Sequence, residues 1–242
     1  MFELGNVIPR IVWVLAKADP NFLFLISKID LKDGYWRMYV SKENAWNFAY
    51  VLPKLSEDKP TRLVVPDALQ MGWSKFPAFF CAATKTDRDV ADKNFESKKE
   101  EPPHKLKDIM IDVDWDSLPP LPKISETGEA QFQNFLKVYI DDFIGLIQCK
   151  DEHQLQRFSR NILNAIYNTF PLPEVTGSEI GPPVSRAKLE LEGKWELRKE
   201  ILGWLIDGLN ITIKLPPNKS KKLLAELDAT IRKSRKKYNK KV

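Results

Sequence analysis

The sequence contains no long hydrophobic run. The apolar runs Ile11–Ala16 and Phe22–Ile26 are far shorter than the roughly 20 residues that a membrane-spanning helix needs. The first residues also lack the basic stretch before an apolar core that marks a secretory signal peptide. We therefore expect neither membrane insertion nor secretion, and we expect an intracellular protein of the cytoplasm or nucleus.

Cysteine is scarce as well. Cys81 and Cys149 stand 68 positions apart in apolar surroundings, which matches neither a disulfide framework nor a zinc-binding pattern. We expect two buried free thiols in a reducing compartment.

The composition of the 242 residues is that of a globular protein, with 43% hydrophobic and 29% charged residues. The net charge of +5 is unevenly distributed. Segment 214–242 has eleven Lys or Arg and two acidic residues, a balance of +9, which leaves −4 for residues 1–213. We therefore divide the chain into a body, 1–213, and a basic C-terminal helix and tail, 214–242. The tail suits nucleic-acid contact, nuclear import or a solvated terminus.

Apolar periodicity predicts the elements of the first half. A helix is expected over 6–18 with Asn6 as its cap, and a buried strand over 22–29 that ends beside Asp30. Further strands are expected over 35–40, 46–52 and 63–65, and a second helix over 74–90. Residues 92–131 contain five prolines and a charged cluster, so we expect a mobile insertion there.

The second half begins with NFLKVYIDDFIGLIQC, in which two apolar runs flank a pair of carboxylates. This pattern predicts a hairpin with Asp141 and Asp142 at its turn. A helix is expected over 152–170, strands over 187–191 and 195–206, and an amphipathic helix over 219–232. The apolar side chains expected on the inside of that last helix are Leu223, Leu224, Leu227 and Ile231. The order of elements indicates an α+β fold, an antiparallel sheet backed by helices.

Three carboxylates stand at the ends of apolar strands: Asp30, Asp141 and Asp142. Adjacent carboxylates repel each other unless a cation neutralises them. Two or three convergent Asp side chains are the oxygen ligands that Mg²⁺ prefers, and two such ions can support phosphoryl transfer. The alternative is that an Asp-Asp pair simply marks a solvated turn.

Four motifs together resemble reverse transcriptases. Tyr139-Ile140-Asp141-Asp142 is similar to their YxDD signature, and Ile29–Trp36 is similar to the first palm motif, an Asp followed five residues later by an aromatic residue. Gln70–Phe80 resembles the next motif, a Gly-Trp turn leading into a helix. Leu202-Gly203-Trp204 resembles the primer-grip hairpin. The motifs occur in the family's order over roughly residues 8–215. The sequence around them is most similar to that of eukaryotic retrotransposon polymerases.

The resemblance implies a polymerase palm and a role for each matching residue. Asp30 and Asp141 would hold two Mg²⁺ ions, with Mn²⁺ as a substitute, Asp142 would support them, and the Leu31 carbonyl would be a further ligand. Tyr35 would exclude a ribonucleotide 2′-hydroxyl, or it is an ordinary core aromatic. The remaining implied contacts are Met71 and Gly72 to the nucleotide, Lys188 to the leaving pyrophosphate, and Leu202, Gly203 and Trp204 to the primer. The alternatives are a solvated strand lysine at Lys188 and a core tryptophan at Trp204.

The implied function is RNA-directed DNA polymerase, a nucleotidyltransferase that joins a dNTP to a primer 3′-OH on an RNA or DNA template. The parent retroelement would add ribonuclease H and integrase domains. Only 29 residues precede Asp30 and 38 follow Trp204, so we expect a truncated palm with partial fingers and the start of a thumb helix. We expect the chain alone to have weak activity. The alternatives are an inactive remnant, a nucleic-acid-binding fragment and an unrelated two-metal nuclease.

Overall fold

A computed structural model describes residues 4–19, 22–97, 100–115, 118, 133–149, 151–172 and 180–238, with side chains as far as residue 233. Its centre is an antiparallel sheet of three strands in the order β1-β5-β4. The strands are β1 (Phe24–Asp30), β4 (Asn134–Tyr139) and β5 (Asp142–Gln148). β4 and β5 form the expected hairpin, and β1 pairs with β5 over seven residues. The fold is therefore α+β, as expected.

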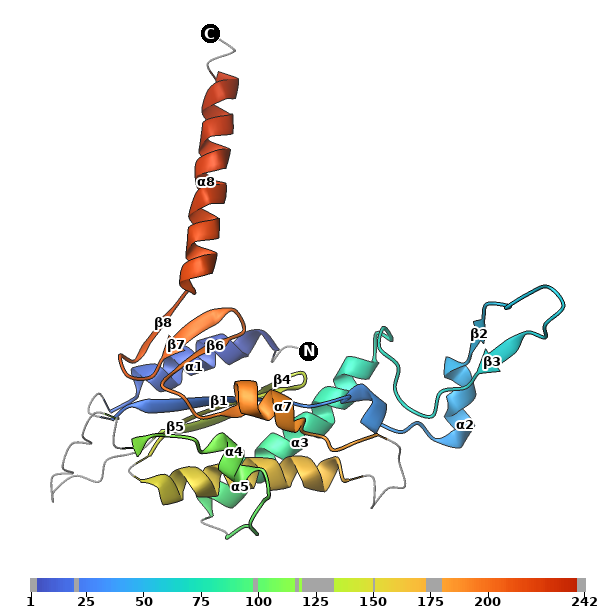
Figure 1. The fold of residues 1–242 in the computed structure, drawn as a ribbon, viewed down its shortest axis with the longest axis horizontal. Helices are drawn as coiled ribbons and strands as arrows, with labels where there is room; N and C mark the ends of the chain where they lie inside the picture. The colour runs from blue at the N-terminus through green and yellow to red at the C-terminus, as the bar shows by residue number, and fades with distance from the viewer. Residues whose placement is uncertain are drawn as a thin grey trace.

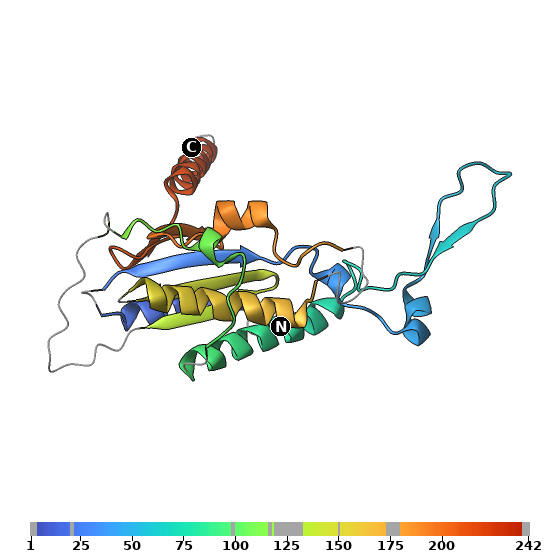
Figure 2. The same cartoon turned by 60° about the horizontal axis from the view of Figure 1, so that its bottom comes forward.

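Both faces of this sheet are covered, which explains why its strands are almost continuously apolar. Helices α3 (Phe76–Glu96) and α5 (Glu152–Thr169) cover one face, and Phe80, Phe143 and Phe158 are buried there. Helix α1 (Val7–Ala16) and a second sheet cover the other face, around Phe24, Ile144 and Ile206. Figures 1 and 2 show these layers. The second sheet is formed by β6 (Arg198–Ile201), β7 (Trp204–Asp207) and β8 (Thr212–Lys214).

Two of the expected helices have nearly the expected bounds. Helix α5 begins after Asp151, whose carboxylate accepts a hydrogen bond from the Gln154 N–H at 2.9 Å. Helix α1 begins after Asn6, but the Asn6 side chain makes no capping hydrogen bond. Both cysteines are free, and Cys149 is buried whereas Cys81 is only partly buried.

The prediction of long strands between residues 35 and 52 was wrong. This segment forms two 3-10 turns, Tyr35–Arg37 (η2) and Trp46–Phe48 (η3), around the short helix α2 (Lys42–Ala45). Only β2 (Tyr50–Leu52) is a strand, and it pairs with β3 (Arg62–Val64) in a hairpin that extends away from the body (Figure 1). Phe48 packs edge-on against Trp73 and Phe76 at the start of α3, so aromatic packing holds this segment together with the backbone bonds that residues 38–40 exchange with residues 67–69.

The segment expected as an insertion packs on the core over part of its length. Asp92–Glu96 continues α3, and the short helix α4 (Lys107–Met110) buries Met110 in the core. Residues 119–132, which contain three of the five prolines, lie outside the described residues. The strand expected over 187–191 was also wrong, because α7 (Arg186–Lys188) and a π-helix, η5 (Leu189–Gly193), occupy it. The strand expected over 195–206 is instead the β6–β7 hairpin.

Helix α8 (Pro217–Tyr238) extends away from the body (Figure 1). The four apolar side chains that were expected on its inside, Leu223, Leu224, Leu227 and Ile231, are all exposed. That expectation was wrong because apolar periodicity shows that a helix has an apolar face, but it does not show whether another element packs against that face. Trp13, Trp36, Trp46 and Trp73 are also exposed. Within the described ranges, no helix combines the length and the apolarity that crossing a membrane requires.

Candidate active site

Strand pairing brings three carboxylates to one end of the central sheet. Asp30 is the last residue of β1 and lies directly opposite Asp142, the first residue of β5. Asp141 precedes Asp142 in the hairpin turn, and its backbone carbonyl accepts a hydrogen bond from the Leu31 N–H at 2.9 Å. The sheet register therefore places the backbone of Asp30, Asp141 and Asp142 at the same end of the sheet, where the sequence analysis expected these residues.

The turn that carries Asp141 is strained. Tyr139 pairs with Asp142, so the loop consists of only Ile140 and Asp141. Ile140 has a φ of 60°, in the left-handed region, which costs a side-chain-bearing residue about 1–2 kcal/mol. A β-branched residue is rare in this conformation. Strain of this kind clusters at functional sites, and here it lies directly beside the carboxylates.

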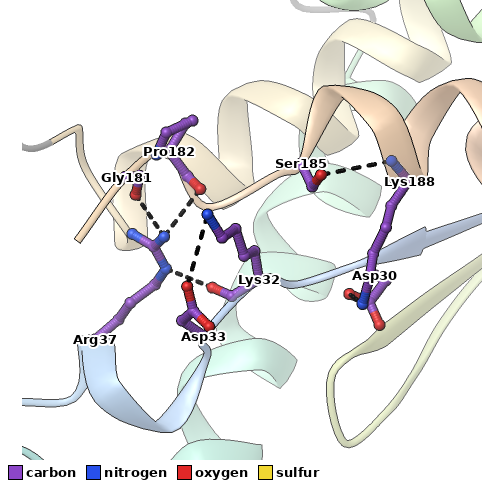
Figure 3. Close-up of polar contacts among 8 residues, drawn as sticks. All are labelled: Asp30, Lys32, Asp33, Arg37, Gly181, Pro182, Ser185 and Lys188. Carbon is purple, nitrogen blue, oxygen red and sulfur yellow. Dashed lines mark hydrogen bonds and ion pairs between the residues drawn. The ribbon is translucent and has the colours of Figure 1, made fainter.

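Lys188 reaches the first carboxylate from another part of the chain. Its Nζ donates to Oδ1 of Asp30 at 2.6 Å, and this hydrogen bond raises the pKa of Lys188 (Figure 3). Lys188 lies on α7 rather than on the expected strand, and Ser185 caps that short turn through the Lys188 N–H. The structure therefore brings Lys188 to the site that the resemblance implied.

A second lysine, Lys28, contacts the site and was missed by the sequence analysis. Its Nζ lies 3.3 Å from Oδ1 of Asp142 and 2.6 Å from Oε2 of Glu192. Lys28 precedes Asp30 by two residues on β1, so both side chains point to the same face of the sheet. That spacing was a readable signal for Lys28, whereas nothing in the sequence singled out Glu192.

The electrostatics of the site favour binding of a further cation. Burial raises the pKa of Asp141 and of Asp142, and the ammonium of Lys28 only partly opposes the shift at Asp142. Burial by itself would lower the pKa of Lys28, but Glu192 and Asp142 hold it above its ordinary value. The hydrogen bond from Lys28 lowers the pKa of Glu192. Four carboxylates therefore face two ammonium groups, and negative charge is in excess.

The donor set suits Mg²⁺, which is bound by carboxylate oxygens together with water and phosphate. The side chains themselves are not gathered around one point, and in the part of the chain that the structure describes no three His, Cys, Asp or Glu side chains could hold a metal ion together. The reason is visible in the contacts, because Asp30 turns to Lys188 and Asp142 turns to Lys28. Binding of a metal would require these carboxylates to leave their lysine partners.

Comparison with known proteins adds no family. No protein-family model matches the chain, and a search of curated proteins finds no match.

Burial raises the pKa of the Tyr35 phenol, and Cys81 and then Asp141 add smaller contributions. The Tyr35 ring stacks on Phe80, with ring centroids 4.6 Å apart. Gly34 packs so closely against the Phe80 ring that no side chain fits at this position. The first turn after β1 is therefore clamped onto α3, and this clamp sets the place of the Tyr35 ring.

Arg37, a second residue that the sequence analysis missed, fixes the same turn from outside. Its guanidinium donates to the backbone carbonyls of Lys32 at 2.7 Å, Gly181 at 2.5 Å and Pro182 at 2.9 Å (Figure 3). These bonds tie the end of β1 to the segment that leads into α7, which carries Lys188. No local sequence pattern indicates a contact over 144 positions.

The other predicted residues lie in turns. Met71 is exposed and Gly72, at a φ of 101°, forms the turn before α3. Leu202 and Gly203 form the two-residue loop of the β6–β7 hairpin, both with positive φ, and Trp204 begins β7. Among the described residues, no hydrogen bond or ion pair joins either turn to the three carboxylates.

Proposed function

We propose that this chain is the palm of a reverse transcriptase, an RNA-directed DNA polymerase that joins a dNTP to the 3′-hydroxyl of a primer. The observation that carries the proposal is the placement of Asp30 opposite Asp142 with Asp141 in the adjoining turn. This placement brings two motifs that are 111 positions apart in the sequence to the same end of the central sheet. The other two motifs also supply turns, one before α3 at Gly72 and one in the β6–β7 hairpin at Leu202 and Gly203, as the resemblance implies.

In this proposal Asp30 and Asp141 hold two Mg²⁺ ions, with Asp142 and the Leu31 carbonyl in support. The chemistry that these ions supply when bound is activation of the 3′-hydroxyl and neutralisation of charge on the phosphates. The protein's own part is placement. β1 and β5 fix the backbone of all three Asp residues, and the strained turn at Ile140 sets the direction of Asp141.

Lys188 and Tyr35 have further roles in the proposal. Lys188 is an ammonium at neutral pH, as lysines ordinarily are, so this group could supply a proton to the leaving pyrophosphate. To do so, it must exchange Asp30 for a phosphate oxygen. The Tyr35 ring, which stacks on Phe80, would limit the space for a sugar 2′-hydroxyl.

The remaining partners follow from the motifs and the charge. Met71 and Gly72 would contact the incoming nucleotide, and Leu202, Gly203 and Trp204 would contact the primer end. Exposed basic side chains of α8, among them Lys221, Lys222, Arg232 and Lys233, suit the phosphates of a template and primer. A retrotransposon polyprotein with ribonuclease H and integrase domains is the proposed parent.

A second candidate function is nucleic-acid binding without catalysis. The observation that favours it is the same exposed basic surface of α8, which needs no carboxylate to bind phosphates. In that case, affinity for nucleic acid falls steeply with salt and does not change when the carboxylates are replaced.

Primer extension separates the two candidates. The full chain is incubated with poly(rA), oligo(dT), dTTP and Mg²⁺ or Mn²⁺, alongside the Asp141→Asn, Asp142→Asn double variant, and binding to the same duplex is measured in parallel. The polymerase proposal expects extension by the natural chain and none by the variant, with similar binding. Binding without extension by either protein would favour the second candidate.

A further inference from the structure

Lys28 bridges a proposed metal ligand and a carboxylate that no motif includes. Its ammonium lies 2.6 Å from Glu192 and 3.3 Å from Asp142, and its side chain is 21% exposed. The shorter contact is therefore the one to Glu192, outside the three-Asp cluster. This asymmetry means that Lys28 keeps a counter-ion even when Asp142 moves away.

The backbone around Glu192 is firmly anchored. Glu192 lies in the π-helix η5, and its carbonyl accepts a hydrogen bond from Nζ of Lys199 at 2.7 Å. The next carbonyl, that of Gly193, accepts from the Ser27 hydroxyl at 2.7 Å. Ser27 and Lys199 are both buried. Glu192 is thus tied to β1 beside Lys28, and it holds the ammonium in place independently of Asp142.

We propose that Lys28, tethered by Glu192, is a positioning residue that holds the Asp142 carboxylate in the metal-free chain and competes with a divalent metal ion for it. The inference rests on the proposed function, because it takes Asp142 to be a metal ligand. It also explains why the three carboxylates are not gathered around one point.

When a metal ion takes Asp142 from Lys28, the Lys28 ammonium is not left unpaired. A half-buried ammonium that lost its only partner would be penalised for desolvation, but Lys28 keeps Glu192. Lys188 differs, because its side chain is 54% exposed and water can solvate it when Asp30 leaves. Lys28 is therefore the lysine whose competition depends on a third residue, and this dependence makes the proposal testable.

Calorimetric titration of the full chain with MnCl₂, without nucleotide or nucleic acid, measures the competition directly. Lys28→Met removes the competitor, and we expect Mn²⁺ to bind about five- to tenfold more tightly. Glu192→Gln leaves Lys28 with Asp142 alone, and we expect about fivefold weaker binding. Lys28→Arg, which keeps the cation and its two partners, should stay close to the natural chain.

Two controls separate this contact from a general change of charge. Lys32→Met removes one positive charge close to the site, but Lys32 pairs with Asp33 and not with Asp142. It should change Mn²⁺ affinity less than Lys28→Met. In the Lys28→Met background, Glu192→Gln should have no further effect, because Glu192 acts through Lys28. Thermal unfolding of each variant without metal checks that it is folded.

The outcomes distinguish the inference from the proposed function. Tighter binding in Lys28→Met, together with a non-additive Glu192→Gln effect, supports the competition. Equal affinities in Lys28→Met and Lys32→Met, or additive effects of the two substitutions, would overturn it while leaving the metal site intact. If Lys28→Met does not fold, weaker binding in Glu192→Gln supports the competition and unchanged binding overturns it. Absence of Mn²⁺ binding in both the natural chain and Lys28→Met would overturn the inference and the metal-dependent function together.

Discussion

Asp30 and Asp142 face each other across the β1–β5 ladder, each at the end of its strand. Carboxylates opposed in this way destabilise a sheet unless something neutralises them. Lys188 and Lys28 do so for these two residues, whereas Asp141 has neither lysine within salt-bridge distance. The site is therefore electrostatically least balanced at Asp141.

Asp141→Asn should stabilise the metal-free chain at neutral pH by about 0.5–1 kcal/mol, because it removes an ionised carboxylate from beside two others. The pKa of Asp141 is raised by burial. The folded chain therefore favours the protonated Asp141 carboxyl. The stability that comes from this preference is fully present at acidic pH and is lost as the pH rises through the folded-state pKa. Urea unfolding of both proteins at pH 4 and pH 7 should show the difference only at pH 7. A destabilised variant at pH 7 would contradict this description of the site.

Tyr35→Val should reduce the preference of the chain for dTTP over UTP, because it removes the ring that stacks on Phe80 beside the carboxylates. Tyr35→Phe keeps the ring and serves as the matched control. We expect the ratio of the two incorporation rates to fall at least tenfold in the Val variant and to change little in the Phe variant. Equal ratios in all three proteins would assign Tyr35 to packing alone.

Asp87, a buried carboxyl on α3, should make stability depend on pH. It is 1% exposed on α3, and burial raises its pKa to about 7, with Thr169 partly opposing the shift. The folded chain therefore loses stability as the pH rises from about 4 towards 7 and above. Asp87→Asn should be more stable than the natural chain by on the order of 1–3 kcal/mol at pH 8, and the difference should shrink at pH 5.

His104 also makes the stability of the chain depend on pH, so Asp87→Asn and the natural chain must be compared with each other at each pH. Burial lowers its pKa to about 4, so stability from this neutral imidazole is lost as the pH falls below the ordinary value for histidine. The two residues act in opposite directions over the same pH range. Urea unfolding of Asp87→Asn and the natural chain at the same pH cancels the contribution of His104. An unchanged difference between pH 5 and pH 8 would contradict the assignment to Asp87.

Gly145→Ala should destabilise the chain by about 1–3 kcal/mol through overpacking. A Cβ at position 145 on β5 would lie 2.9 Å from Cη2 of the buried Trp195. The Trp195 indole cannot easily move, because its Nε1–H donates to the Ser159 hydroxyl at 2.8 Å. Gly5→Ala is the control, since nothing lies within 4 Å of a Cβ there. Similar urea midpoints for both variants would show that the sheet adapts at Gly145.

The sequence was most informative where a strand or helix is defined by its own residues. The apolar run before Asp30, the two runs around Asp141-Asp142 and the stripe of α5 predicted their elements because each buries a face against the central sheet. The strand ends then bring the backbone of the three Asp residues to one end of the sheet, and this placement could be predicted from the sequence.

The errors arose where distant packing decides the conformation. Residues 35–52 were expected to form strands, but Tyr35 stacks on Phe80 of α3 and Phe48 packs against Trp73 and Phe76. Residues 187–191 form helical turns rather than a strand, and the Ser185 side chain caps the first of these turns. Lys28–Glu192 and Arg37–Gly181 join segments that are far apart in the chain, so no local pattern could reveal them.

The most direct test of the account is the rate at which a single dTMP is added to a primer paired with an RNA template, measured under single-turnover conditions with Mn²⁺. The natural chain is compared with Asp141→Asn and with Asp33→Asn. The second variant makes the same chemical change three residues after Asp30, at a φ of 55° that Asn tolerates well. We predict slow but measurable addition by the natural chain and Asp33→Asn, and at least a hundredfold loss in Asp141→Asn. Equal rates in all three folded proteins would contradict a catalytic site at these carboxylates.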